Sequence, residues 1–414
     1  MSDAYSRDRN YVRSLLVSAS AGMFIWGIIA SIAPLATAWP YVKGLPRVYL
    51  SVFLSLPSVF LLTGNTILGK LSDILGRKPI YLMTILFYLA GLLIIFASNN
   101  VVLLVIGIAL SEIGVGGEEV TTLSLISEDV PIKHRGKFLA FVPNMNNVGS
   151  AVIAFVFLYF NSSSIQIQKL YFLIIAFFAV FLALYTRRSI PESFRWLRET
   201  GSEKEAENLY KKLKISEDGI RIKEPNFSVS LAFLAILGIS QYLTFGLMAY
   251  IVGPYYFSPA QVSEIIFYAL LGASVAGIIA MFLVDIGRKK YAILSYLGGT
   301  ISILLILATI KYVDNMLVFL PLLFINMMFS EFAWASRTTL EPELFGTKRR
   351  STSIGLVRVF PILAYIASIY LTASFTLSQY IFFNLALWCL GLVAAIVWMF
   401  IGVETKNVSM DYYS

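Results

Sequence analysis

Long apolar runs separated by short polar loops are the feature of this sequence that most constrains its fold. A helix needs about 20 apolar residues to cross the hydrocarbon core of a bilayer, and runs of that length follow one another along the 414 residues. We expect spans at 14–38, 48–70, 79–98, 101–126, 137–160, 167–186, 228–252, 260–284, 291–310, 316–340, 352–376 and 379–402. The sequence therefore predicts an all-α membrane protein with twelve transmembrane helices.

The composition agrees with that assignment. The chain is 58% hydrophobic and only 14% charged, whereas a soluble domain carries about 25% charged residues. The formal net charge is +8, but one side of the predicted spans holds only Lys43, Arg47, Lys169 and Lys311. Because basic loops stay in the cytoplasm, we expect a multi-pass plasma-membrane protein with both termini cytoplasmic. The basic excess then reflects topology, and we expect no nucleic-acid partner.

Cysteine and histidine usage limits the chemistry of the chain. It has one cysteine, Cys389, and one histidine, His134. This excludes an intrachain disulfide and leaves no histidine or cysteine cluster for a metal, so we expect neither a metal nor a cofactor. The polar residues 1–13 lack the apolar core of a cleaved signal peptide, so we expect the first span to remain as an anchor.

The loop between the second and third spans reads G-K-L-S-D-I-L-G-R-K-P. We expect Asp73 to end one helix, Gly76 to turn the chain, and Pro79 to start the next helix, where its missing N–H costs nothing. Arg77 and Lys78 lie where cytoplasmic positive charge is favoured. The pattern resembles G-x-L-x-D-x-x-G-R-K, the signature between helices 2 and 3 of the major facilitator superfamily.

Other segments extend this resemblance along the whole chain. Residues 191–197 resemble the P-E-S-P-R-W-L signature of sugar porters and related metabolite:proton symporters, and residues 403–407 are similar to their P-E-T-K-G. Residues 114–118, followed by Glu128 and Arg135, resemble a pattern of organic-acid and nicotinate-type members. The resemblance implies a transporter, not an enzyme, with two pseudo-symmetric six-helix bundles around a central cavity.

The two halves of the chain repeat weakly, as expected of a transporter built from related bundles. The loop between the second and third spans has a counterpart in D-I-G-R-K at 285–289, which is one residue shorter and lacks the leading glycine. The pair Glu128 and Arg135 is echoed by Glu343 and Arg350. The missing glycine leaves the geometry of the second turn open.

The repeat divides the chain into three parts. We expect an N-terminal bundle at 1–186, a cytoplasmic linker at 187–226 and a C-terminal bundle with a short tail at 227–414. Within the linker, residues 202–213 carry apolar side chains at helical spacing with interleaved charges of both signs. This pattern predicts a short amphipathic helix along the membrane surface.

The resemblance also carries a cytoplasmic charge network onto matching positions of this sequence. They are Asp73, Arg77, Glu128, Arg135, Glu192, Arg195, Asp285, Arg288, Glu343, Arg350 and Glu404. Carboxylates and arginines at helix ends can pair when the cytoplasmic side is closed and separate when it opens. An exposed pair contributes about 0–1 kcal/mol, so several together can bias a rocking equilibrium. The alternative is that these residues only fix the topology.

Charged residues inside the spans are functional candidates, because a charge at the bilayer centre costs at least ~2.5 kcal/mol. The fourth span supplies three proton-coupling candidates, Glu112, Glu118 and Glu119. We favour Glu118, which lies near mid-depth after a glycine run that lets a neighbouring helix pack closely. Glu112 and Glu119 share a helix face, and Glu118 points about a quarter turn away. The alternative for Glu118 is a salt bridge to Arg337 or Arg358.

A second group of residues is expected to bind the substrate. Arg358 would hold a carboxylate bidentately, or it pairs with Glu331 or a fourth-span glutamate instead. The other candidates are amide, hydroxyl or aromatic side chains within spans, namely Asn144, Asn147, Gln241, Tyr250 and Trp334. The alternative is that the amides bond neighbouring helices and the aromatic residues lie in the core or face lipid.

These features together favour proton-coupled symport of a small polar organic metabolite, a sugar or an organic acid, by alternating access. Residues 22–27 contain no acid, although many sugar:proton symporters carry an aspartate in the first span. Either the fourth-span glutamates take the proton, or the protein is an uncoupled sugar uniporter. An aromatic-acid or organic-acid:proton symporter is a further alternative. A non-transporting receptor of this kind usually carries a long cytoplasmic tail, whereas only about a dozen residues follow Gly402. We therefore favour a transporter over a receptor. We expect a monomer in the lipid bilayer.

Overall fold

The computed structural model describes residues 2–160, 163–188, 190–213, 223, 225–313 and 315–408, and they form helices joined by short turns. The first half contains α1 (Ser2–Ala30), α2 (Ile32–Ala36), α3 (Arg47–Leu75), α4 (Arg77–Ala97), α5 (Val101–Asp129), α6 (Ile132–Tyr159) and α7 (Ile165–Arg187). Two short helices follow, α8 (Phe194–Glu199) and α9 (Glu203–Leu213). The amphipathic segment expected at 202–213 is therefore helical.

The second half repeats the same plan. Its helices are α10 (Phe227–Gly246), a π-helix at Leu247–Ile251, α11 (Val252–Tyr256), α12 (Pro259–Leu283), α13 (Arg288–Ala308), α14 (Met316–Glu343), α15 (Arg350–Thr372) and α16 (Leu377–Ile401). Short 3-10 turns lie at Val284–Ile286, Ile310–Tyr312 and Thr347–Arg349. The remaining linker residues 214–222 and 224 lie outside the described part of the chain.

The prediction of twelve transmembrane helices is confirmed, since twelve helical segments of the described chain are long and apolar enough to cross a membrane. Two of them are interrupted. The first breaks at Ser31, between α1 and α2, and the seventh contains the π-helix between α10 and α11. A π-turn inside a helix often marks a functional site, and this one ends beside the cavity described below.

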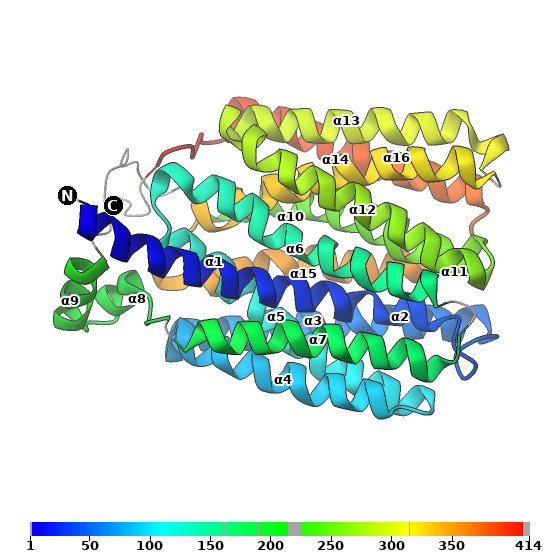
Figure 1. Cartoon of the computed structure of the whole chain (residues 1–414). Helices are drawn as coiled ribbons and strands as arrows, with labels where there is room; N and C mark the ends of the chain where they lie inside the picture. Colours follow the sequence, from blue (N-terminus) through cyan, green and yellow to red (C-terminus); the bar gives the residue numbers. More distant parts are fainter. Residues whose placement is uncertain are drawn as a thin grey trace.

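The helices form two six-helix bundles, and the main contacts between them are those of α6 with α12 and of α3 with α15 (Figure 1). Helix α6 packs against α1 in its own bundle and against α12 in the other, and α15 packs against α10 and across against α3. The first residues of α1, the last residues of α16 and the short helices α8 and α9 lie at the same end of the molecule (Figure 1). We call this end the terminal side and the opposite end the far side.

The turns between α3 and α4 and between α12 and α13, which we call the hinge turns, are formed by glycines at positive φ. Helix α3 continues through Asp73 to Leu75, so the expectation that Asp73 ends the helix is wrong. The chain turns at Gly76 (φ 106°), and α4 already begins at Arg77, two residues before Pro79. In the second half Gly287 (φ 122°) makes the equivalent turn. The second half thus turns at a positive-φ glycine without the leading glycine, although a 3-10 turn at Val284–Ile286 precedes Gly287, whereas α3 stays helical up to Gly76.

Candidate functional site

Buried ion pairs on the terminal side form two clusters, each centred on one glutamate. In the first cluster, Arg77 of α4 contacts Asp73 at 2.6 Å and Glu128 at 3.0 Å. Arg350, which begins α15 in the other bundle, contacts the same Glu128 at 2.9 Å. Arg195 of α8 donates to the Glu128 backbone carbonyl at 3.0 Å. Glu128 thus joins arginines from both bundles.

The second cluster repeats this arrangement with the bundles exchanged. Arg288 of α13 contacts Asp285 at 3.4 Å and Glu343 at 3.0 Å. Arg135, from α6 in the first bundle, contacts Glu343 at 3.2 Å. The Thr405 hydroxyl donates to Glu343 at 2.6 Å. Each bundle therefore gives one arginine to the glutamate of the other.

A second pair of glutamates caps the helices that follow the hinge turns. The backbone N–H groups of Arg77 and Lys78 donate to Glu192 at 2.9 and 3.1 Å. In the second half, the Arg288 N–H donates to Glu404 at 2.9 Å. Burial raises the pKa of the Glu192 carboxyl, and the backbone N–H bonds oppose that rise. A carboxylate at a helix N-terminus also interacts favourably with the helix dipole.

The structure thus brings all eleven predicted network residues together on the terminal side, and we call them the charge layer. Most of their side chains are buried, which corrects the expectation of exposed pairs. Removing one partner of a buried pair leaves an uncompensated charge and costs about 3–5 kcal/mol. Asp73 adds a further link between the bundles, because the Thr352 backbone N–H donates to it at 2.7 Å. The layer thus links the two bundles at the terminal side.

On the far side, neutral hydrogen bonds link the two bundles. The hydroxyls of Ser51 in α3 and Tyr255 in α11 lie 2.6 Å apart. Those of Ser55 in α3 and Tyr370 in α15 lie 3.0 Å apart. Each such bond contributes only about 0.5–1.5 kcal/mol net, so the far side is held more weakly than the terminal side.

Glu118, the favoured proton candidate, lies inside the first bundle. It forms a salt bridge with Arg187, the last residue of α7, and accepts a hydrogen bond from Thr84 at 2.7 Å. The Arg187 guanidinium also covers the Tyr81 ring at 3.7 Å. The salt bridge considered as an alternative for Glu118 thus exists, with Arg187 in place of Arg337 or Arg358.

Glu119 and Arg358 belong to a chain of charges between the bundles. Arg358 of α15 pairs with Glu119 of α5 and contacts Glu341 of α14 at 2.7 Å. Glu341 also contacts Arg337 at 2.9 Å, and Arg337 donates to Gln241 at 2.5 Å. Arg358 therefore pairs with a fourth-span glutamate, as one of the two alternatives proposed.

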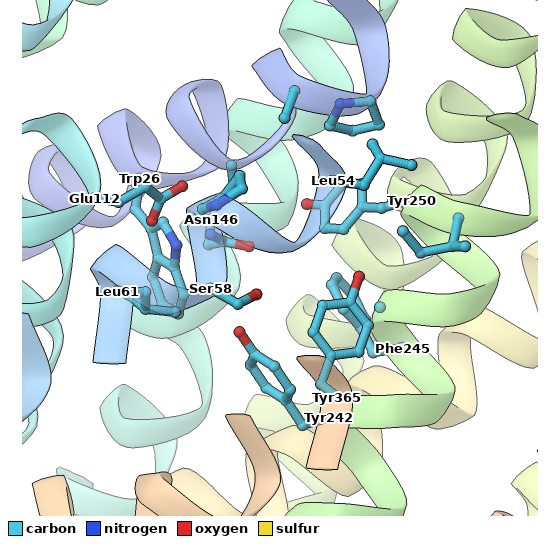
Figure 2. A pocket seen from close by; sticks show the side chains of 16 residues that line it. Trp26, Leu54, Ser58, Leu61, Glu112, Asn146, Tyr242, Phe245, Tyr250 and Tyr365 are labelled. Atoms are coloured by element: carbon cyan, nitrogen blue, oxygen red, sulfur yellow. The ribbon is translucent and has the colours of Figure 1, made fainter. Parts of the chain in front are cut away.

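A central pocket lies between the bundles on the far side of these charges. Its space is about 600 Å³ when the open solvent at its mouth is included, but its cavity volume is only about 70 Å³, below the ~300–1,000 Å³ typical of ligand pockets. Its lining is mainly aromatic and small, and comprises Trp26, Ala30, Ala33, Pro34, Leu54, Pro57, Ser58, Leu61, Glu112, Asn146, Tyr242, Phe245, Gly246, Tyr250, Ile251 and Tyr365. Figure 2 shows aromatic rings from both bundles facing the same space.

Glu112 is the only charged residue among those that line the pocket. Figure 2 shows its carboxyl in the same part of the pocket wall as the side chains of Trp26 and Asn146. Its Oε1 is buried and has no hydrogen-bond partner among the described residues. The like-charged Glu119 lies seven residues further along the same face of α5 and interacts electrostatically with Glu112. The pocket thus presents one carboxyl group without a cationic partner within the described chain.

Of the six predicted substrate residues, Tyr250 lines the pocket. Trp334 packs edge-on against the lining residue Trp26, with 5.7 Å between ring centroids. Gln241 and Arg358 lie in the charge chain described above. Asn144 donates to the Ser274 carbonyl at 3.0 Å, and Asn147 donates to Glu331 at 2.6 Å. In this conformation the two asparagines therefore bond neighbouring helices.

Sequence reasoning missed several residues of this region. Arg187 was assigned to the polar linker because it lies one residue beyond the predicted sixth span, yet it points back into the bundle. In the sequence, nothing distinguishes Ser58, Tyr242 and Tyr365 from the many other isolated hydroxyls within the spans. The π-helix that ends beside Tyr250 gave no signal in the sequence.

Comparisons with known proteins agree with this architecture. The family described as sugar (and other) transporter matches residues 24–414. NiaP of Bacillus subtilis, provisionally named a niacin/nicotinamide transporter, is 24% identical over 86% of this chain and 87% of its own length. The glucose transporter GlcP of Staphylococcus epidermidis is 26% identical over 70% of each chain. The proton:xylose symporter XylE, solved with 6-bromo-6-deoxy-D-glucose, shares the fold with a TM-score of 0.80 and 17% identity, over 97% of this chain and 98% of the other.

Proposed function

Because the chain belongs to the sugar (and other) transporter family, we propose that it carries a small neutral polar molecule, with a sugar as the first candidate, together with a proton. The central pocket is the binding site, and Glu112 is the residue that takes the proton. The observation that carries this proposal is a carboxyl group without a cationic partner in the wall of an aromatic pocket.

The pocket lining supports a neutral substrate over an organic acid. The side chains of Ser58 and Asn146 and the hydroxyls of Tyr242, Tyr250 and Tyr365 can exchange hydrogen bonds with substrate hydroxyls. The aromatic rings offer flat apolar surface to the faces of a small ring. Within the described lining no lysine or arginine is present to hold a carboxylate, and Arg358 is already paired with two glutamates.

Glu112 supports proton coupling better than the other two glutamates do. Glu118 and Glu119 each pair with an arginine, so each proton would compete with a salt bridge. A carboxyl group in an apolar wall favours its neutral form unless a cation or water stabilises the charge. Glu112 can therefore hold a proton while the pocket is closed and release it when water enters.

The charge layer supports an assignment of which end of the molecule opens to the cytoplasm. We propose that the terminal side faces the cytoplasm, because basic loops gather there. In the conformation described, the buried ion pairs close that side. Alternating access then requires the bundles to rock until the layer separates and the pocket opens toward the terminal side. The charge layer acts as the cytoplasmic gate in this proposal.

The test is proton entry into proteoliposomes that contain an internal pH indicator. We expect a sugar added on the far side to drive acidification with the wild type, and Glu112→Gln to abolish it while substrate exchange between the two faces continues. Glu112→Asp serves as the matched control because it keeps the carboxyl group. If Glu112→Gln still acidifies the interior at the wild-type rate, the assignment of Glu112 is wrong. If substrates enter without protons, the protein is a uniporter.

A neutral aromatic heterocycle is the second candidate substrate. Five aromatic residues line the pocket, namely Trp26, Tyr242, Phe245, Tyr250 and Tyr365, and NiaP is named for niacin and nicotinamide. Nicotinamide is neutral and would stack on such rings, whereas nicotinate carries a carboxylate for which the described lining offers no lysine or arginine. Adding nicotinamide and nicotinate separately in the same assay distinguishes these two cases from a sugar.

A further inference from the structure

A second buried carboxyl group lies outside the pocket, between the bundles. Glu331, on α14, is fully buried. Its Oε2 accepts a hydrogen bond at 2.6 Å from the Asn147 side-chain amide of α6, in the other bundle. Within the described chain it forms no salt bridge. This bond links the two bundles near the middle of both helices.

The hydrogen bonds around Glu331 leave two buried oxygen atoms without a donor among the described residues. Both N–H groups of the Asn147 amide are used, one toward Glu331 and one toward Asn144 at 3.0 Å. The Asn147 Oδ1 and the Glu331 Oε1 are both buried, and neither has a donor among the described residues. Two acceptor oxygens in one cluster thus lack a hydrogen, and an ionised carboxylate brings none. A proton on Glu331 provides the missing one.

The surroundings offer no positive charge as a substitute within the described chain. Helix α6 presents the amides of Asn144 and Asn147, and Asn144 in turn bonds the Ser274 carbonyl of α12. Helix α13 contributes Tyr291, a buried phenol close enough to interact electrostatically with Glu331. On α14 itself the next charged residues, Arg337 and Glu341, pair with each other.

From this geometry we propose that Glu331 is a proton-binding residue separate from the substrate pocket, and that its protonated form holds α6 against α14. When Glu331 loses the proton, a buried charge with a single hydrogen bond remains at the bundle interface. Burying such a charge is unfavourable, so the bundles separate to admit water. The inference rests on the proposed function only in that the two bundles move relative to each other.

The test measures the distance between the bundles as a function of pH, without any substrate. Spin labels are placed at the exposed positions Lys133 in α6 and Lys290 in α13, both on the terminal side, in a Cys389→Ser background. We expect the wild type to show a short distance at pH 5 and a growing long-distance population up to pH 8.5. Glu331→Gln, which is neutral and can donate to Asn147, should stay short throughout. Glu331→Asp should keep the pH response.

Two further variants keep the test decisive. Tyr291→Phe should retain the response, because an ordinary tyrosine stays protonated over this range. Asn147→Asp places a second carboxyl group beside Glu331, so the two share one proton and the midpoint should rise by about one pH unit or more. This variant provides the answer if Glu331→Gln does not fold.

The proposal is overturned if Glu331→Gln responds to pH as the wild type does, if the wild type does not respond, or if Asn147→Asp leaves the midpoint unchanged. It is also overturned if the distance follows the sodium concentration at constant pH. Because no substrate is present, the outcome is independent of the pocket. Proton-coupled sugar uptake in proteoliposomes can be absent while the distance still responds to pH. Equally, the distance response can be absent while proton-coupled uptake is present.

Discussion

The charge layer and the charges in the middle of the membrane differ in whether they are repeated between the two halves of the chain. The layer occurs twice, with Glu128 and Glu343 each joining an arginine from both bundles. The mid-membrane charges do not repeat. Counted from Glu128 and Glu343, the second-half positions that correspond to the three fourth-span glutamates are Met327, Ala333 and Trp334. We therefore propose that the repeated part closes the bundles, whereas the unrepeated part, which distinguishes one bundle from the other, carries the substrate and proton chemistry.

The largest expected effect comes from breaking the unrepeated pair inside the first bundle. Arg187→Leu leaves the Glu118 carboxylate buried without its cation, which should lower the free energy of unfolding by about 3–5 kcal/mol. Thermal unfolding of the purified protein in detergent, followed by tryptophan fluorescence, measures the loss.

The double variant Glu118→Leu/Arg187→Leu is the control for this prediction. Replacing a buried pair by apolar residues of similar size is often neutral or stabilising, so the double variant should recover most of the stability. If it transports as the wild type does, the pair is structural. If it is stable but inactive, Glu118 takes part in coupling and the preference for Glu112 is wrong.

An intermediate effect is expected from the repeated clusters. Glu128→Gln and Glu343→Gln each remove the shared partner of two arginines, so both should shift the bundles toward an open terminal side. Because the clusters are equivalent, we expect similar shifts, of about 1–3 kcal/mol each in the balance between open and closed states. The spin-label pair at Lys133 and Lys290 reports the open population at constant pH.

Double variants that change a glutamate together with its arginine partner from the other bundle test whether the two residues act together. Arg350→Gln combined with Glu128→Gln should be less disruptive than the sum of the two single changes, because the residues contact each other at 2.9 Å. The same holds for Arg135→Gln with Glu343→Gln. Additive effects in either pair would mean that the cluster fixes topology and does not act as a gate.

The difference between the two regions also explains what the sequence could predict. The twelve spans follow from the length of apolar runs, and the charge layer follows from motifs whose residues lie at fixed positions beside helix ends. Burial could not be predicted, since pairs such as Arg77–Glu128 lie in loops by sequence and become enclosed only when the bundles meet. The partners of Glu118 and Arg358 depend on the rotation of each helix, which span prediction does not give. Two residues of the pocket lining, Tyr250 and Ile251, lie in the π-helix at Leu247–Ile251, which has no recognisable pattern in the sequence.

The smallest effect compares the two hinge glycines, which have the same role in the repeat but different surroundings. Gly76 and Gly287 both adopt positive φ, where a non-glycine residue costs about 1–3 kcal/mol. A Cβ added at Gly76 would lie 2.3 Å from Oε2 of Glu192, whereas one at Gly287 would lie 3.2 Å from Oε2 of Glu404. Gly76→Ala must therefore displace the carboxylate that caps α4, and Gly287→Ala need only shift its counterpart slightly.

We expect both alanine variants to lower the thermal unfolding temperature, and we expect the larger decrease for Gly76→Ala. The backbone strain is common to both, so the difference between them isolates the contact with the capping glutamate. Combining each change with Glu192→Ala or Glu404→Ala removes that contact and should make the two glycine positions equivalent. If Gly76→Ala stays the more harmful in the Glu192→Ala background, the asymmetry lies in the turn itself, and the first hinge is not a structural copy of the second.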